Sequence, residues 1–212
     1  MIDVKDILNT VIEGDCLDIM RQLPDKCIDL VLTDPPYGIK QYGKILGRNN
    51  LLKNTTCIWN YKPDPMYFDE IKRISKHQII WGGNYFNLGI SRCYLVWDKK
   101  QPIKQFARCE LAWTSFDKNS DIIEYPYYGN VNQDIREHPT QKPEYLFKYV
   151  LLNYTVPGMT IFDPFAGSGT TAIACLETGR NYILIEKEPD YVKIINNRIA
   201  QWKEQGRMFA TC

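Results

Sequence analysis

Short apolar runs, each about the length of one strand, alternate along the sequence with segments whose apolar residues follow a helical period. Some of these runs, such as Tyr182–Ile185, are apolar throughout, which is typical of a sheet that helices cover on both faces. The alternation predicts an α/β fold with a mostly parallel, twisted sheet. The expected strands span Thr10–Glu13, Ile28–Thr33, Gln78–Trp81, Tyr94–Trp97, Glu110–Thr114, Thr160–Phe162 and Tyr182–Ile185.

The expected helices lie between these strands, and each places its apolar residues on one side. Two stretches, residues 39–63 and 115–140, show no clean period. We expect them to be long loops inserted into a single domain that spans residues 1–212. The expected helices span Pro65–Lys76, Pro143–Asn153, Thr170–Thr178 and Pro189–Trp202.

One expected strand leads into a helix through a glycine-rich turn, Asp163-Pro164-Phe165-Ala166-Gly167-Ser168-Gly169-Thr170. Gly167 and Gly169 can adopt positive φ and let a ligand approach the backbone closely. Glu186 ends the next expected strand, where an acid typically binds the ribose hydroxyls of a nucleotide-like cofactor. Asp163 would repel a pyrophosphate but could hold an ammonium group, and Phe165 crowds the place of a diphosphate. These residues favour S-adenosylmethionine; a dinucleotide-dependent oxidoreductase and a turn without ligand are the alternatives.

A second motif, Thr33-Asp34-Pro35-Pro36-Tyr37-Gly38, follows directly on an expected buried strand. Each proline disfavours helical geometry in the residue before it and lacks an N–H, so the chain should stay extended as a rigid ledge. The ledge would lie at the carboxyl end of a strand, where open α/β sheets bind ligands. A plain surface turn is the structural alternative.

The chemistry of this ledge suits the exocyclic amine of a nucleobase. Hydrogen bonds from the amine to the Asp34 carboxylate and the Pro35 carbonyl would favour a pyramidal nitrogen, whose lone pair could attack an electrophilic methyl group. Tyr37 would stack on the base, and a base within a duplex would have to be flipped out to reach it.

Together, the two motifs resemble those of the DNA amino-methyltransferases, which act on adenine N6 or cytosine N4. The catalytic motif, Asp34-Pro35-Pro36-Tyr37, precedes the cofactor motif, Asp163–Gly169, as in the permuted beta group of that family. The resemblance extends over nearly the whole chain. It implies a Rossmann-like class I methyltransferase fold with circularly permuted motifs, and S-adenosylmethionine as the cofactor.

Shorter pieces extend the resemblance around the cofactor. Gly14-Asp15-Cys16 resembles the piece that contacts the cofactor's adenine, and the segment His138–Pro143 resembles the one that meets its methionine carboxylate. A common turn and a solvated lysine are the structural alternatives for these pieces. The residues expected to bind the cofactor are Asp15, Cys16, Thr140, Lys142, Asp163, Phe165, Ala166, Gly167, Ser168, Gly169, Thr170 and Glu186.

Positive charge is concentrated in one loop of a chain whose formal net charge is only +1. No acidic residue occurs between Gly38 and Pro63, so the basic side chains of this stretch could hold DNA phosphates. Solvated loop charge is the alternative. The phosphate contacts expected here are Lys40, Lys44, Arg48 and Lys53, and a second basic group contains Lys99, Lys100, Lys104 and Arg108.

Other features exclude several classes of protein. The N-terminus lacks the basic start and apolar core of a signal peptide, and no apolar run is long enough to span a membrane. The seven cysteines are scattered without a CxxC pair, and the two histidines lack cysteine partners at ligand spacing. We therefore expect a cytoplasmic protein with reduced thiols and no metal site.

The resemblance favours adenine N6 as the methylated atom, because aspartate starts the catalytic motif and N4-cytosine enzymes more often carry serine there. Cytosine N4, a base in RNA, and a DNA-binding relative without catalysis are the alternatives. Target recognition would fall to Asp117–Glu137. That segment is short, which suggests a short target site or a homodimer that shares recognition, and the sequence leaves a restriction partner open.

Overall fold

The computed structural model describes residues 1–38, 61–102, 107–126 and 142–210. Five residues that the sequence nominates for binding lie outside these ranges: Lys40, Lys44, Arg48, Lys53 and Thr140.

The described strands form one eight-stranded sheet in the order β1-β8-β7-β2-β3-β5-β4-β6. Neighbours from β1 to β3 in this order are parallel, whereas β5 runs antiparallel to both β3 and β4. The expectation of a mostly parallel sheet is therefore confirmed. The strands are β1 (Thr10–Glu13), β2 (Ile28–Thr33), β3 (Ser75–Trp81), β4 (Tyr94–Asp98), β5 (Cys109–Thr114), β6 (Asp121–Glu124), β7 (Thr160–Asp163) and β8 (Asn181–Glu186).

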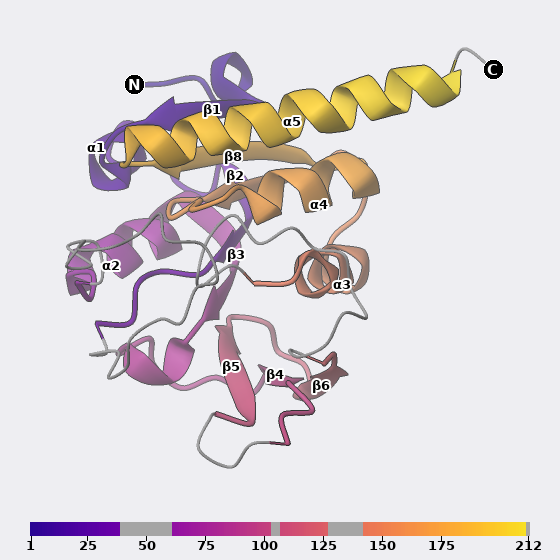
Figure 1. Ribbon diagram of the computed structural model, residues 1–212. Coiled ribbons are helices and arrows are strands. Elements are labelled where there is room, and N and C mark those ends of the chain that lie inside the picture. Colours follow the sequence, from indigo (N-terminus) through magenta and orange to yellow (C-terminus); the bar gives the residue numbers. More distant parts are fainter. Residues whose placement is uncertain (39–60, 103–106, 127–141, 211–212) are drawn as a thin grey trace, which may run out of the picture.

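Helices cover both faces of this sheet, and α5 and α4 run side by side across β1 and β8 (Figure 1). Local sequence signals set their ends: Asp64 caps the N-terminus of α2, and Gly179 in the left-handed conformation ends α4, as expected. The helices are α1 (Cys16–Met20), α2 (Pro65–Ile74), α3 (Glu144–Tyr154), α4 (Thr170–Thr178) and α5 (Pro189–Ala210), with 3₁₀ turns η1 (Val4–Ile7) and η3 (Gly83–Tyr85).

The core is divided between the two faces because successive strand residues point to opposite sides. Leu30 and Leu32 of β2 pack in a cluster with residues of α3, α4 and α5. Val31, between them, packs in a second cluster with residues of α1 and α2. Burial on both faces explains why runs such as Tyr182–Ile185 of β8 are apolar throughout.

The observed elements differ from the expected ones at four main places. The helix expected to end at Trp202, α5, extends to Ala210. The helix expected to reach Lys76 ends at Ile74, and the next two residues begin β3. The short helix α1 was not expected, and the segment 115–140, expected to be irregular, contains β6. Only Ile123 of β6 is buried, so this strand lacks the apolar signal of the others. Among the described residues, no helix is both long and apolar enough to cross a membrane.

Candidate active site

Four acidic residues follow neighbouring parallel strands at one edge of the sheet. Asp15 comes after β1, Glu186 ends β8, Asp163 ends β7 and Asp34 comes after β2. The chain leaves β7 for α4 on one face, whereas the helix that precedes β3, α2, covers the other face. The winding of the sheet therefore reverses between β7 and β2, and open α/β sheets bind ligands at such a point.

The Asp34 carboxylate is hydrogen-bonded through both of its oxygens. The Tyr37 hydroxyl donates to Oδ1 at 2.6 Å, and Lys142 Nζ lies 2.6 Å from Oδ2. Burial raises the pKa of the Asp34 carboxyl, against the opposing influence of the Lys142 charge. Because a carboxylate offers about four lone-pair positions, Asp34 can still accept a hydrogen bond from an amine.

The sequence predicts that the Tyr37 ring stacks on the target base. In the structure the ring already stacks on a protein side chain. It stacks on Tyr85 of η3, with centroids 4.8 Å apart and planes inclined by 21°. Its edge lies against Gly82, where a Cβ would come within 2.1 Å of Tyr37 Cε1. Gly82 and Tyr85 were not predicted as residues of this site, because their contacts with Tyr37 depend on the pairing of β2 with β3.

Lys142 is buried against the segment Asp34–Tyr37, named here the catalytic corner after its proposed role, and only 6% of the lysine side chain is exposed. Its ammonium group has three acceptors: Asp34 Oδ2, the Tyr37 hydroxyl at 2.9 Å and Glu110 Oε2 at 3.1 Å. Burial alone would lower the pKa of Lys142, but Asp34, Tyr37 and Glu110 raise it well above its ordinary value. Lys142 is therefore not a solvated lysine. It was expected to meet the cofactor's carboxylate, but the partners that the structure gives its ammonium group are protein groups.

Glu110, at the start of β5, is a site residue that the sequence reasoning missed. Its second oxygen pairs with Lys99, and the two lysines help to lower the pKa of the Glu110 carboxyl although burial opposes this. Lys99 is 11% exposed in its side chain, so the structure does not support its expected place in a surface group of basic residues. Lys100 forms ion pairs with Asp98 and Glu124.

The glycine turn and Glu186 meet as expected from their spacing. The Gly167 N–H donates to Glu186 Oε2 at 2.8 Å, and the other oxygen accepts from the Glu188 N–H at 2.9 Å. Gly167 has a φ of +53°, and no atom lies within 4 Å of the place where a Cβ would stand. Burial raises the pKa of the Glu186 carboxyl despite these backbone donors. An open backbone beside a carboxylate fits a ribose-bearing cofactor without a diphosphate.

Asp163 differs from its expected role of holding an ammonium group. It is 3% exposed, and it accepts hydrogen bonds from the Thr33 hydroxyl at 2.7 Å, the Phe165 N–H at 3.1 Å and the Thr171 hydroxyl. Burial raises the pKa of the Asp163 carboxyl to about 6 against these donors. The side chain therefore ties the ends of β7 and β2 to the start of α4.

Asp15 and Cys16 adjoin the opposite end of the same edge. Asp15 caps α1 through the Leu17 N–H and accepts the Tyr67 hydroxyl at 3.0 Å from each oxygen. Tyr67 also lies beside Phe165, with ring centroids 6.0 Å apart. Cys16 is buried, and burial raises the pKa of its thiol. Asp15 and the two rings thus border the space next to Gly167, whereas Cys16 packs inside.

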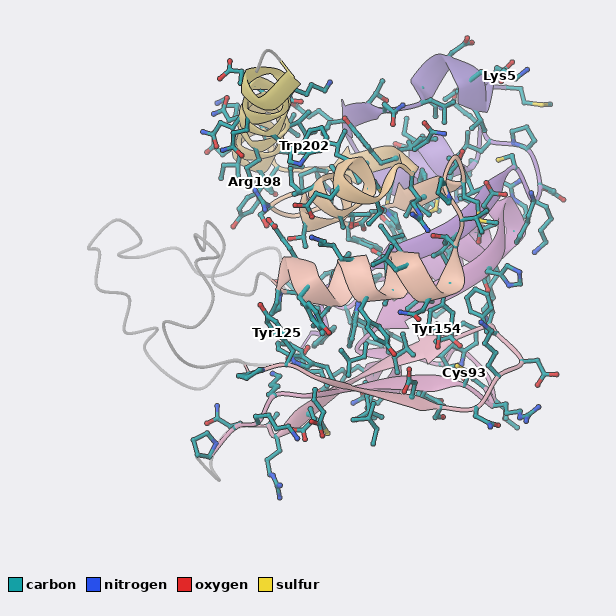
Figure 2. All side chains as sticks on the ribbon, turned by 90° about the vertical axis from the view of Figure 1, so that its right-hand side faces the viewer. Lys5, Cys93, Tyr125, Tyr154, Arg198 and Trp202 are labelled. Atoms are coloured by element: carbon teal, nitrogen blue, oxygen red, sulfur yellow. The ribbon has the colours of Figure 1, made fainter. Side chains whose placement is uncertain are left out.

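The other residues of the glycine turn are packed inside the protein. Ala166, Ser168 and Thr170 are buried, and the Ser168 carbonyl accepts a hydrogen bond from Arg198, which also pairs with Glu144 of α3. Arg198 lies on α5, whose next turn carries Trp202 (Figure 2). Gly169 packs so closely on α5 that a Cβ would lie 2.8 Å from Ile195.

The segment expected to read the target is described only as far as residue 126. Tyr125 stacks on Tyr145 of α3, with centroids 4.6 Å apart, and its carbonyl accepts the Trp97 indole N–H at 2.8 Å. Tyr125 lies at one end of α3, and Tyr154 lies beside Cys93 at the other end (Figure 2). The start of the segment is therefore anchored to the body of the domain.

The residues at the carboxyl edge of the sheet form two groups with different chemistry. One is an open glycine turn bordered by Glu186, Asp15 and aromatic rings, which suits a nucleoside-like group. The other is a carboxylate with remaining acceptor capacity, held by Tyr37 and Lys142. Among the described residues, no group of three metal-ligating side chains is assembled.

The chain is similar to known DNA methyltransferases. A sequence model of the N6/N4 type, described as DNA methylase, matches residues 52–197. The chain is 29% identical to the type II methyltransferase M.HinfI of Haemophilus influenzae, over 95% of this chain and 71% of that protein. The crystal structure titled as the M1.HpyAVI–SAM complex has a TM-score of 0.57 and 22% identity, covering 89% of this chain and 98% of that one. The cytosine-N4-specific PvuII DNA methyltransferase has a TM-score of 0.60 and 17% identity, covering 88% and 84%.

Proposed function

The chain belongs to the N6/N4 DNA methylase family, and from this premise we propose that it transfers a methyl group from S-adenosylmethionine to the N6 amine of adenine in DNA. The target base would be flipped out of the duplex to reach the catalytic corner. The observation that carries the proposal is the Asp34 carboxylate, held at the switch point beside the open glycine turn.

The described residues suit S-adenosylmethionine, which supplies an electrophilic methyl group on a positively charged sulfur. Glu186 would accept hydrogen bonds from the ribose hydroxyls, and the open backbone at Gly167 would let the cofactor approach. Asp15 and Phe165 would border its adenosine part. The complex of M1.HpyAVI with SAM, as titled, supports the same choice of cofactor for a protein of this fold.

The catalytic corner would act through hydrogen bonding and charge. Asp34 and the Pro35 carbonyl would accept the two N–H groups of the amine and keep its lone pair directed at the methyl carbon. As the new N–C bond forms and the S–C bond breaks, positive charge passes to the amine nitrogen, and the negative charge of Asp34 stabilises it. The carboxylate would also accept the proton that the nitrogen then loses.

Cytosine N4 is the second candidate for the methylated atom. Its exocyclic amine offers the same two N–H donors, and the cytosine-N4-specific PvuII enzyme shares this fold. The aspartate that starts the catalytic motif favours adenine by resemblance to the family. Lys40, Lys44, Arg48 and Lys53, which lie outside the described residues, are proposed to bind the phosphates of either target.

Methyl transfer can be read directly from the products. The protein is incubated with methyl-labelled S-adenosylmethionine and unmethylated DNA, and the digested nucleosides are separated by chromatography, with RNA as a parallel substrate. We expect label in N6-methyldeoxyadenosine. Label in N4-methyldeoxycytidine would keep the chemistry and change the base, whereas absence of label from DNA would overturn the proposed function.

A further inference from the structure

Ion pairs of alternating sign extend from the catalytic corner into the sheet. Asp34 pairs with Lys142, Lys142 with Glu110 at 3.1 Å, and Glu110 with Lys99. The two inner members are largely shielded from water, with 6% of the Lys142 side chain and 24% of the Glu110 side chain exposed. Charges so placed are screened far less than surface pairs, so each one influences its neighbours.

Glu110 reaches this place because β5 is antiparallel. Its start lies at the sheet edge where β3 ends, as shown by the pairing of Trp81 with Ala112. Lys99 directly follows β4, whose residue Trp97 pairs with Glu110. Two strands that carry no part of either motif therefore deliver a carboxylate and an ammonium group to the catalytic corner.

This inference rests on the proposed function, and it concerns the effect of the Lys142 charge on the target amine. Methyl transfer places positive charge on the target amine. The ammonium group of Lys142, which is bonded to Asp34, would repel that charge and would reduce the stabilisation that the Asp34 carboxylate gives it. The carboxylate of Glu110, which Lys142 shares with Lys99, offsets part of this repulsion. We propose that Glu110 is a positioning residue that neutralises Lys142, so that the negative charge of Asp34 stays available to the target amine.

Glu110→Gln tests this role. The charged and titratable groups that face Asp34 are Lys142, Tyr37, Glu110 and, across the end of β7, Asp163. Removing the charge of Glu110 removes a repulsion that raises the pKa of Asp34, so the acidic limb of kcat/KM against pH should move to lower pH. Since Lys142 would then offset Asp34, kcat should fall roughly ten- to a hundredfold, somewhat less than the loss of a group that contacts the reacting atoms. Affinity for S-adenosylmethionine, measured by calorimetry, should be retained.

Lys99→Gln should act in the opposite direction. Glu110 would lose one of its two cations, so Asp34 would experience more negative charge and the acidic limb should move to higher pH. If Glu110 and Lys99 only stabilised the fold, the two variants would have no reason to shift the acidic limb of kcat/KM in opposite directions. The control is Glu177→Gln, which removes a carboxylate of similar exposure from an ion pair with Lys148 far along α4 and should leave both kcat and the pH limb unchanged.

An NMR titration of the Asp34 side-chain carboxyl carbon, in protein without DNA, gives the same answer independently of activity. The pKa of Asp34 should fall in Glu110→Gln and rise in Lys99→Gln. Unchanged values, or shifts of the same sign, would overturn the proposal even if the wild-type protein methylates DNA. Should Glu110→Gln fail to fold, the Lys99→Gln shift alone decides. Failure of the proposed function would instead be recognised by wild-type protein that methylates no DNA.

Discussion

Single residues at the catalytic corner are constrained by contacts that the motifs do not reveal. Gly82 follows β3 with a φ of +67°, and its bare Cα makes room for the Tyr37 ring. That ring carries the hydroxyl that bonds to Asp34 and accepts from Lys142. Any side chain at Gly82 would therefore displace a group in direct contact with Asp34, the proposed catalytic carboxylate.

Gly82→Ala should lower kcat at least about tenfold, because a Cβ 2.1 Å from Tyr37 forces the ring away from Asp34. Affinity for S-adenosylmethionine should change little, since Gly82 lies apart from the glycine turn. Steady-state methylation kinetics and calorimetry measure the two effects. Gly89→Ala is the matched control: Gly89 also has a positive φ, +88°, but no atom lies within 4 Å of its missing Cβ. Equal turnover in the two variants would contradict this role of Gly82.

The sequence predicted the candidate catalytic corner and the glycine turn, but it could not predict the residues that contact them from other elements. Asp34, Tyr37, Gly167 and Glu186 stand in motifs whose residue types express their chemistry. Glu110, by contrast, opens an ordinary apolar run, and only the antiparallel direction of β5 brings it to Lys142. Strand direction depends on pairing across the sheet, which local sequence does not encode.

At the scale of elements, the buried side chain of Asp163 joins two strands and a helix at the glycine turn. Asp163 ends β7, and its oxygens accept hydrogen bonds from Thr33 at the end of β2 and from Thr171 in α4. Burial raises the pKa of its carboxyl to about 6, from an ordinary value of 3.8. The folded protein therefore favours the protonated form more strongly than the unfolded chain does.

This shift predicts a pH dependence of stability. The contribution of Asp163 should be fully present below about pH 4 and lost as the pH rises through about 6, a change on the order of 2–3 kcal/mol. Asp163→Asn cannot titrate, so the free energy of unfolding of wild type minus that of the variant should decrease from pH 4 to pH 7 in urea titrations. Asp190→Asn, a change at an exposed carboxylate, is the control. A difference that rises with pH would show that the charged form of Asp163 is the stabilising one.

The elements themselves were predictable where burial is strong. β2 has the expected bounds, β7 extends the expected strand by one residue, and β8 extends it by one residue at each end, because strands covered on both faces keep an apolar run. β1 also has the expected bounds, although none of its residues is fully buried. β6 lies on the sheet margin with Ile122 largely exposed, so its sequence resembles a loop. The five-residue helix α1 is too short to develop a helical period.

At the scale of the molecule, the fold gathers residues from distant parts of the chain. Lys142 donates to the Tyr37 hydroxyl across a separation of 105 residues, and the Gly167 N–H reaches Glu186 from the preceding strand–helix unit. Both hydrogen bonds lie at the carboxyl edge of the sheet, on either side of the point where its winding reverses. One edge can therefore hold a methyl donor and a methyl acceptor in neighbouring places.

The charge of the molecule fits a local rather than a general attraction to nucleic acid. A formal net charge of +1 gives little long-range attraction, so we expect affinity for DNA to depend on local clusters, such as the basic residues that the sequence places between Gly38 and Pro63. The buried ion pairs at the catalytic corner contribute nothing to that attraction, because each lysine there is paired with a carboxylate.

Asp34→Asn tests the central claim most directly, because it removes the catalytic charge and keeps the shape of the side chain. Methyl transfer to DNA and calorimetric affinity for S-adenosylmethionine are measured on the same preparations of wild type and variant. The account predicts that transfer falls by about a hundredfold or more while the cofactor affinity is nearly unchanged. Near-normal transfer by Asp34→Asn would contradict it and remove Asp34 from the chemistry.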